Sequence, residues 1–259
     1  MPFEALELSH QQGVTTLTLN RPERLNTIDL PALDEIIAAL AEVRRSSARV
    51  LVLAGKGKAF CAGADQGEMV PRAPAEWEAI VDHYLDPLRA LMALPIPTVA
   101  KIHGDCIGGG VGLALSCDFR IMRAGARIGI PFVKIGLAGC DMGAGYFLPR
   151  MVGFGRALDL MMTGRLLAAE EAERIGLVQR IASAETFEAD AAALVTQLAA
   201  GPPRALRATK EAAYRSLDRD REAEFDFEVF AQVQCLQTAD HREGVAAFKE
   251  KRPPTFKGA

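Results

Sequence analysis

Three consecutive glycines constrain this chain more than any other short segment. Gly108, Gly109 and Gly110 lie in IGGGVGLALSCD (107–118), between an apolar run typical of a strand and a small-residue run typical of a helix. A glycine inside a regular element costs about 0.5–1 kcal/mol relative to alanine, so three together need a structural reason. We expect close backbone approach, because N–H groups at a helix start can then point at an anionic oxygen. A tight strand-to-helix turn without a ligand is the alternative.

A second turn built from small residues occurs in KAFCAGADQGEM (58–69), after the buried-looking strand VLVLAG (50–55). It places Ala62, Gly63 and Ala64 at the point where the strand ends and the chain turns. Two such turns, each offering one backbone N–H, are what an oxyanion hole with two donors requires.

Four motifs follow one another along the chain: LNRPERLN (19–26), KAFCAGAD (58–65), IGGGVGLALSCD (107–118) and REGVAAFKEKRPPTF (242–256). Together they resemble the crotonase (enoyl-CoA hydratase/isomerase) superfamily, and the resemblance covers nearly the whole chain. It implies a spiral of repeated ββα units and an acyl-CoA thioester substrate. It implies no prosthetic group, since coenzyme A is part of the substrate.

Strands alternating with helices independently predict an α/β fold. Strands are expected at 14–19, 50–54, 97–102, 118–122, 127–130 and 177–181, and helices at 76–93, 109–117, 143–152, 155–162, 168–175 and 185–200. Another helix lies between the first two strands, with Asp29 as a candidate cap and Pro31 in its first turn. Pro149 is expected to disturb its helix near Tyr146, and Gly153 to end that helix.

The chain divides by composition into a core at residues 1–200 and a C-terminal region at 201–259. Strand patterns stop near Gly201, and three helical segments follow, separated by Gly, Pro or charged residues. In the superfamily such a region packs trimers, often paired into hexamers. The resemblance therefore implies a homo-oligomer, either a trimer or a dimer of trimers.

Composition excludes several classes of protein. The formal net charge of −3 argues against a nucleic-acid partner, because phosphate binding depends on clustered Lys and Arg. No apolar run approaches the roughly 18 residues that cross a membrane, and the start of the chain lacks a long apolar segment. The five cysteines are odd in number and have no CxxC or Cys/His spacing, so we expect neither disulfides nor a metal site. A reducing cytoplasm is the expected compartment.

The resemblance implies that the N–H groups of Ala64 and Gly109 hold the thioester carbonyl. Proton removal beside a thioester places negative charge on that oxygen, which two preorganised donors stabilise. The resemblance further implies coenzyme A contacts from the residues around Ala64, namely Ala62, Asp65 and Gln66. For Asp65 the alternative is a turn or cap residue.

Basic and aromatic residues outside that turn match the family's coenzyme A elements. The resemblance assigns Phe248 and Lys251, near the end of the chain, to the adenine and phosphates, in some members across a subunit boundary. Arg24 is a further candidate for the phosphates, because a guanidinium binds phosphate oxygens through charge-assisted hydrogen bonds. A solvated charge run is the alternative for each basic residue.

Both glutamates that hydratases of the family use are absent. One of the two positions is Gly112, two residues after the glycine triplet, and the other is Phe132 in IPFVKIGL (130–137). Hydration needs one group to activate water and another to manage the α-proton, so this pair cannot perform it in the usual way. Gly112, Phe132 and Met142 are instead expected to line the acyl pocket.

Asp141 is the remaining acid–base candidate, in GLAGCDMGAGYFLPRMVG (136–153). Dienoyl-CoA isomerases, ring-opening isomerases of phenylacetyl-CoA breakdown and 4-chlorobenzoyl-CoA dehalogenases resemble the chain here, each with an active aspartate. Its neighbours are apolar or small, so burial among them would raise its pKa and suit a base that takes and returns a proton. The alternative is that Asp141 caps the helix beginning near Gly143.

These observations favour an acyl-CoA enolate enzyme that isomerises an unsaturated or strained-ring acyl-CoA with Asp141 as base. An enoyl-CoA hydratase or acyl-CoA hydrolase is the second hypothesis, and a dehalogenase with Asp141 as nucleophile is a further one. The hypothesis from a different class is a catalytically inactive homologue that binds coenzyme A or RNA.

Overall fold

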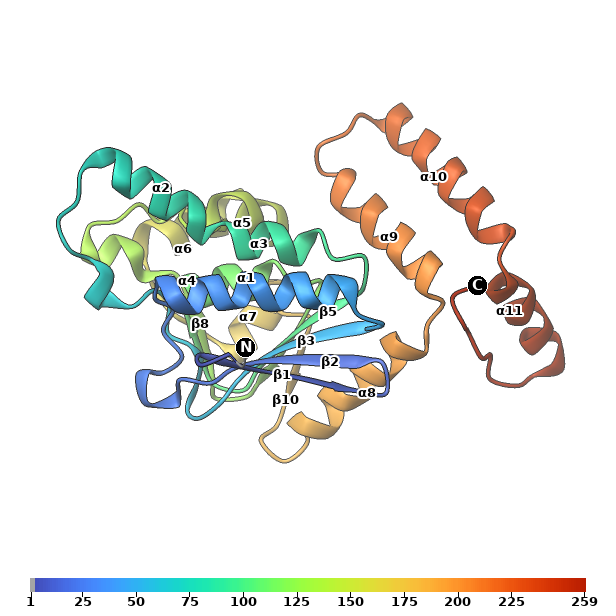
Figure 1. Cartoon of the computed structure of the whole chain (residues 1–259). Coiled ribbons are helices and arrows are strands. Elements are labelled where there is room, and N and C mark those ends of the chain that lie inside the picture. Colours follow the sequence, from blue (N-terminus) through green and yellow to red (C-terminus); the bar gives the residue numbers. More distant parts are fainter. Residues whose placement is uncertain (1–2) are drawn as a thin grey trace.

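The computed structural model describes residues 3–259 as two β-sheets flanked by helices (Figure 1). The larger sheet has the strand order β1-β2-β3-β5-β7-β10. Its strands are β1 Leu6–Gln11, β2 Val14–Leu19, β3 Val50–Gly55, β5 Thr98–Ile102, β7 Phe119–Arg123 and β10 Arg180–Ala182. β1 and β2 are antiparallel, and the other neighbours in this sheet are parallel.

A smaller sheet consists of β4 Ala59–Cys61, β6 Asp105–Ile107, β8 Arg127–Gly129 and β9 Leu167–Ala168. The chain alternates between the two sheets. β3, β5 and β7 enter the larger sheet, the strand after each enters the smaller one, and helical segments lead back. This repeated ββα path is the spiral that the resemblance implies, and the predicted α/β class is confirmed.

Helices cover both faces of the larger sheet (Figure 1). The helices of residues 3–200 are α1 Leu30–Arg45, α2 Pro74–Tyr84, α3 Asp86–Met92, α4 Gly109–Leu115, α5 Ala144–Val152, α6 Phe154–Thr163, α7 Ala169–Arg174 and α8 Phe187–Ala200. Short 3₁₀ turns are η1 Pro22–Arg24, η2 Gln66–Glu68 and η3 Pro131–Ile135.

The central strand β3 is buried on both faces, as its uninterrupted apolar sequence predicts. Because side chains alternate along a strand, Leu51 and Leu53 join the main core, while Val50 and Val52 pack with apolar residues of α8. The helix expected between the first two strands is α1. The Asp29 carboxylate accepts a hydrogen bond from the Ala32 N–H at 3.0 Å and caps it, as predicted.

Two helix predictions were wrong. The helix expected at 76–93 is broken into α2 and α3, because Pro87 in the first turn of α3 has no N–H to continue the α2 ladder. Pro149 does not interrupt α5, which runs on to Val152 before Gly153 ends it. Pro149 lies inside α5 and has no N–H to donate to the Gly145 carbonyl, yet the helix continues for three more residues.

The C-terminal region forms the three expected helices: α9 Pro203–Arg215, α10 Arg221–Leu236 and α11 Ala239–Glu250. They extend away from the sheets (Figure 1). Polar contacts tie them to the core. The Arg49 guanidinium donates to the carbonyls of Gly201 at 2.8 Å and Phe256 at 3.0 Å, and Lys210 pairs with Asp118 at 3.0 Å.

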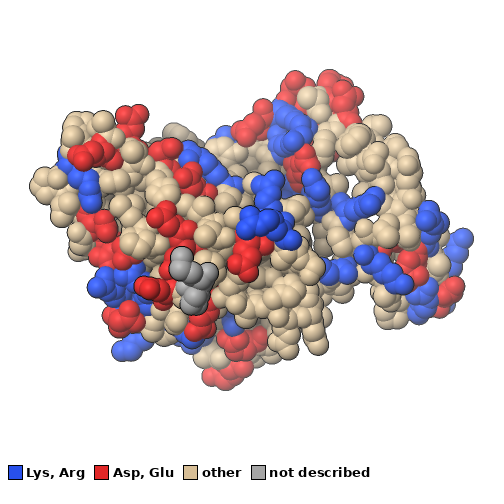
Figure 2. All heavy atoms as spheres, in the orientation of Figure 1, with Lys and Arg blue, Asp and Glu red and all other residues tan. Residues whose placement is uncertain are grey.

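Acidic and basic side chains are interspersed on the face of the molecule that Figure 2 shows, as expected for 30 Lys and Arg against 33 Asp and Glu. Of the helices between residues 3 and 259, none combines the length and apolar character that a membrane crossing requires.

Asn26 fixes the loop between η1 and α1 against β4. Its amide group donates to the carbonyls of Lys56 at 2.9 Å, Ala59 at 2.8 Å and Phe60 at 3.2 Å. Its side-chain oxygen accepts from the Arg21 N–H at 2.9 Å. The backbone of this buried residue is left-handed (φ 56°), a conformation that asparagine tolerates better than most residues.

We expect Asn26→Ala to lower the free energy of unfolding by about 2–3 kcal/mol, because buried carbonyl oxygens lose their donor. Urea-induced unfolding monitored by circular dichroism measures the change. Asn20→Ala is the control, since the Asn20 amide contacts Glu7 at an exposed site and its loss should matter by less than about 0.5 kcal/mol. Equal losses for the two variants would contradict this role of Asn26.

Candidate active site

The two small-residue turns lie side by side. β4 leads into Ala62–Ala64 and β6 leads into Gly108 and α4, and these two strands are parallel neighbours in the smaller sheet. Their carboxyl ends therefore meet at one edge. The turns are so close that a Cβ atom on Gly63 would lie 3.2 Å from the Gly109 nitrogen, and one on Gly109 would lie 3.6 Å from the Ala64 nitrogen.

Both predicted oxyanion donors are free of other partners. Ala64 faces Ile28 in a single parallel bridge, in which the Ile28 N–H donates to the Gly63 carbonyl and the Asp65 N–H to the Ile28 carbonyl, each at 2.8 Å. In this pairing the N–H of Ala64 itself points away from Ile28. Within residues 3–259, no acceptor takes the N–H of Ala64 or of Gly109. Both donors are thus available to an acceptor from outside the chain.

The glycine triplet is explained by close backbone contact, as expected. A Cβ atom on Gly110 would lie 2.5 Å from the Cys61 carbonyl oxygen, which is a severe overlap. Gly108 has φ 55° and ψ −119°, a conformation open to glycine but strained for other residues. α4 can therefore approach β4 only because its first residues have no side chains.

The opposite end of α4 is covered by a buried arginine. Arg120, 3% exposed, donates to the carbonyls of Cys117 at 2.7 Å and Ala114 at 3.4 Å, and to that of Leu177 at 2.8 Å. The bonds to Cys117 and Ala114 place the positive charge of Arg120 at the carbonyl end of α4.

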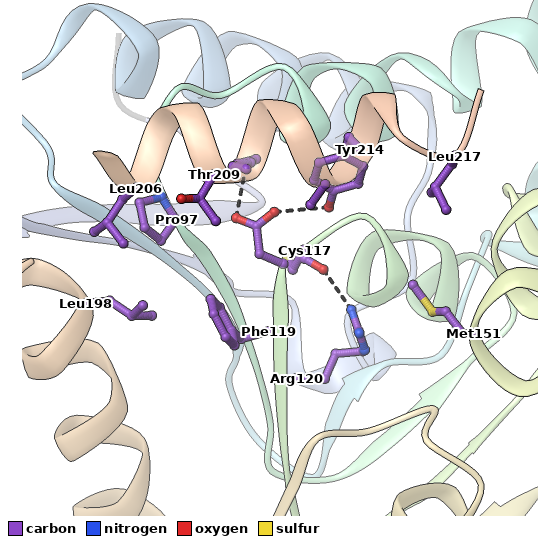
Figure 3. A pocket seen from close by; sticks show the side chains of 13 residues that line it. Pro97, Cys117, Phe119, Arg120, Met151, Leu198, Leu206, Thr209, Tyr214 and Leu217 are labelled. Carbon is purple, nitrogen blue, oxygen red and sulfur yellow. Dashed lines mark hydrogen bonds and ion pairs between the residues drawn. The ribbon is translucent and has the colours of Figure 1, made fainter. Parts of the chain in front are cut away.

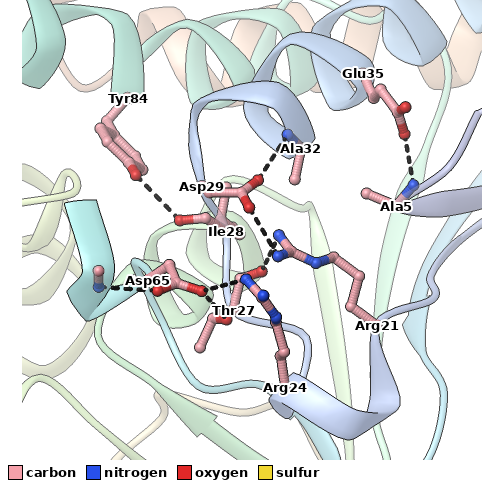
Figure 4. Close-up of polar contacts among 11 residues, drawn as sticks. Ala5, Arg21, Arg24, Thr27, Ile28, Asp29, Ala32, Glu35, Asp65 and Tyr84 are labelled. Atoms are coloured by element: carbon pink, nitrogen blue, oxygen red, sulfur yellow. Dashed lines mark hydrogen bonds and ion pairs between the residues drawn. The ribbon is translucent and has the colours of Figure 1, made fainter.

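Asp65 is the N-cap of η2, as predicted by the alternative interpretation of this residue as a turn or cap residue. One carboxylate oxygen accepts from the Gly67 N–H at 2.9 Å and the other from the Thr27 hydroxyl at 3.1 Å, with Arg24 at 3.4 Å (Figure 4). The Gly67 N–H chiefly lowers the pKa of Asp65, and Thr27 and Arg24 lower it further. Ala62 and the exposed Gln66 lie beside it, so these candidates for coenzyme A share one edge of the site.

The Gly112 position is filled by the backbone of the loop before α5. A Cβ atom on Gly112 would lie 2.6 Å from the Met142 carbonyl oxygen and 2.8 Å from the Met142 Cβ. Phe132 is buried, and its ring edge lies 3.4 Å from the Cβ position of Gly108. The three residues predicted to line the acyl pocket are thus brought together around the glycine turn.

Asp141 precedes Met142 in this loop but is only half-buried, because Leu137 and Cys140 beside it are exposed. The expected enclosure among apolar neighbours is therefore incomplete. The capping alternative was also wrong. α5 begins after Gly143, which has φ 75° and no capping side chain, and the Asp141 carboxylate instead accepts from the Met142 N–H at 2.7 Å.

The predicted coenzyme A residues near the end of the chain lie apart from this site. Phe248 in α11 is 86% exposed, and Lys251 follows that helix. Figure 1 shows α11 at the far end of the molecule from α4 and α2. One copy of the chain does not bring Phe248 and Lys251 to Asp65 and Arg24.

An apolar cavity of about 340 Å³ lies between α9 and the core (Figure 3). Its polar groups bond to one another, since the Asp118 carboxylate accepts from the Tyr214 hydroxyl at 3.0 Å and pairs with Lys210. The residues that line it include none of the predicted site residues. The predicted oxyanion donors lie at the paired turns, outside this cavity.

Comparison with known proteins agrees with this geometry. The family model described as "Enoyl-CoA hydratase/isomerase" matches residues 9–259. The chain belongs to this family. It is therefore an acyl-CoA-processing enzyme of the hydratase/isomerase type, and its spiral is the crotonase fold.

Relatives in the family match over their full length. A protein of Rhodobacter capsulatus, described as a probable enoyl-CoA hydratase, is 35% identical and covers 100% of both chains. The 1,2-epoxyphenylacetyl-CoA isomerase of Escherichia coli is 38% identical, covering 97% of this chain and 98% of its own. The crystal structure of enoyl-CoA hydratase from Bacillus anthracis superimposes with a TM-score of 0.94 at 33% identity, covering 99% of this chain and 100% of its own.

Sequence reasoning missed two residues that hold the site. Asn26 lies within the LNRPERLN motif, so its place in that motif was the available signal. Tyr84 had no such signal, because a single tyrosine at the end of a helix is common in protein cores. Its hydroxyl donates to the Ile28 carbonyl at 3.0 Å, beside Ala64.

We expect Gly112→Ala to lower the free energy of unfolding by about 1–3 kcal/mol, because the methyl group overlaps the Met142 backbone. Thermal and urea unfolding measure the loss. Gly155→Ala in α6 is the matched control: its added Cβ meets nothing within 4 Å, so it should be neutral or slightly stabilising. A Gly112→Ala protein as stable as the wild type would show that the loop around Met142 moves aside at little cost, which would contradict this prediction.

Proposed function

We propose that this enzyme isomerises an unsaturated acyl-CoA by moving one proton within the acyl chain. The proposal rests on the filled Gly112 position: the Met142 backbone occupies the place of a hydratase glutamate, and Phe132 stands at the other. With a backbone segment at one position and a phenylalanine at the other, neither position supplies a carboxylate to activate water or manage the α-proton.

The N–H groups of Ala64 and Gly109 bind the thioester oxygen in this mechanism. The Asp141 carboxylate takes a γ-proton from a 2-enoyl thioester. The electron pair of that C–H bond moves into conjugation and gives a dienolate whose charge lies on the thioester oxygen. Asp141 then returns the proton to the α-carbon, so the product has the mass of the substrate. One oxyanion donor contributes about 2.7–4 kcal/mol to such a step.

The E. coli relative supports an isomerase, since its name describes isomerisation of an acyl-CoA and it is 38% identical. That resemblance extends the proposal to strained rings, in which Asp141 would act beside an epoxide. Partial exposure of Asp141 is compatible with a base that must reach substrates of different shape.

The coenzyme A portion is proposed to lie along the edge formed by Ala62, Asp65, Gln66 and Arg24. Arg24 is more than half exposed beside Asp65 and can turn toward a phosphate. Phe248 and Lys251 would complete this binding site from a neighbouring copy of the chain, because their own copy holds them far from it.

A homo-oligomer follows from this arrangement and from an apolar stripe on α10. The stripe consists of exposed side chains at helical spacing, namely Phe225, Val229, Val233 and Leu236. An exposed apolar face of this kind typically marks an interface with another protein. We propose that a second copy of this chain covers it.

Hydration is the second candidate, and the name of the Rhodobacter relative favours it. Asp141 alone would then have to direct water to the β-carbon. The two reactions differ in product mass by one water molecule, so one assay separates them.

We expect isobaric double-bond migration when the enzyme is given 3-enoyl-, 2-enoyl- and dienoyl-CoA thioesters. Asp141→Asn should reduce that rate about 10²- to 10⁴-fold, because the base is lost while the donors remain. Mass-resolved chromatography of the products measures both. Asp159→Asn, on the exposed side of α6, should leave the rate unchanged. Water addition that survives Asp141→Asn would overturn the isomerase proposal.

We expect Val229→Glu to convert the oligomer to monomers at micromolar concentration, because a charge enters the proposed apolar interface. Sedimentation velocity measures the change. Glu222→Gln, exposed on the same helix, should leave the oligomer intact. A monomeric wild-type protein would refute this part of the proposal without bearing on the chemistry.

A further inference from the structure

The hydroxyl of Tyr84 connects α2 to the oxyanion turn. Tyr84 ends α2 and is 9% exposed, and it donates a hydrogen bond to the carbonyl oxygen of Ile28 at 3.0 Å (Figure 4). The two residues are 56 positions apart along the chain. This contact therefore joins α2 to Ile28, the residue that pairs with Ala64 in an isolated parallel bridge.

The backbone of Ile28 holds Ala64 from both sides. The Ile28 N–H donates to the carbonyl before Ala64, on Gly63, and the Ile28 carbonyl accepts from the N–H after Ala64, on Asp65, each at 2.8 Å. The orientation of the Ala64 N–H therefore depends on where the Ile28 backbone lies. Because a carbonyl oxygen has two lone pairs, the bonds from Asp65 and Tyr84 can exist together.

Tyr84 is itself held firmly. Its neighbour His83 contacts Asp34 of α1 at 2.9 Å and Asp86 of α3 at 3.0 Å. Burial, with the nearby carboxylates of Glu68, Asp29 and Asp65, raises the pKa of Tyr84 to about 12, while Arg72 opposes them. The hydroxyl consequently remains a donor at every pH at which such an enzyme would be assayed.

We propose that Tyr84 is a positioning residue for the oxyanion hole: through Ile28 it sets the direction of the Ala64 N–H. This inference rests on the proposed function, in which that N–H binds the thioester oxygen. In this role Tyr84 acts through Ile28 and not on the substrate. Its hydroxyl holds the Ile28 carbonyl against small displacements, to which a preorganised donor is sensitive.

The test uses the whole enzyme and butyryl-CoA carrying ¹³C at the thioester carbonyl, a saturated thioester that has no double bond to move. Infrared difference spectroscopy compares the carbonyl stretch of the bound and free probe. The wild type should shift this band to lower frequency, because two donors polarise the carbonyl. Tyr84→Phe should reduce the shift by about half, with probe affinity within about threefold, and should lower kcat about tenfold with little change in KM.

Tyr214→Phe is the matched control, because it also removes a buried tyrosine hydroxyl, which is bonded to Asp118 near α9. It should leave the band shift unchanged. Replacing Tyr84 with p-aminophenylalanine keeps a donor at the same place and should restore the wild-type shift. The p-aminophenylalanine variant keeps the test valid if Tyr84→Phe does not fold. A carbonyl band shift smaller than that of the wild type in this variant would overturn the inference.

The outcomes separate this inference from the proposed function. A wild-type enzyme that binds the probe without a band shift would contradict the oxyanion hole itself. A normal wild-type shift that Tyr84→Phe retains would overturn the positioning role alone. A shift lost equally in Tyr84→Phe and Tyr214→Phe would indicate general loosening of the fold and would likewise overturn it.

Discussion

The contact between α4 and the end of β4 is made by backbone atoms, and the candidate site depends on it. Gly110 lies against the Cys61 carbonyl, and Gly63 against the Gly109 nitrogen. Since Gly109 and Gly110 contribute no side chain to this contact, the separation of the two turns is set by backbone packing and by the pairing of β4 with β6 in the smaller sheet. The site therefore inherits its geometry from the fold, and pocket side chains can vary around it.

Sequence patterns predicted the parts of the fold that are long or strongly apolar. β3 and α1 were clear, since one is an uninterrupted apolar run and the other has an apolar face and a cap. Pattern reasoning found only part of the smaller sheet. It predicted β8, expected at 127–130, but not β4 or β6 as separate strands, because segments of three residues are too short to show alternation. The resemblance to a family supplied the spiral that these strands build.

The site was predicted less evenly than the fold. The small-residue turns led to Ala64 and Gly109, and the structure brings these two turns together; their role as oxyanion donors stays a prediction. The surroundings of Asp141 were not predictable from the sequence. They depend on how the loop before α5 packs Met142 against Gly112 while Leu137 and Cys140 of the same loop stay exposed. Sequence reasoning identified a missing glutamate at Gly112, but only the structure shows that Met142 has closed the space.

The buried guanidinium of Arg120 has a consequence for the electric field in the site. α4 has seven residues and is roughly 10 Å long, with Gly109 at its positive end and Arg120 on its carbonyl end. A positive charge there cancels the negative pole that would otherwise oppose the Gly109 N–H. At an effective dielectric constant near 20, that charge attracts an anion about 10 Å away by roughly 1–2 kcal/mol. In the proposed mechanism, part of the attraction for an enolate thus comes from a buried residue behind α4, so it does not depend on the acyl group.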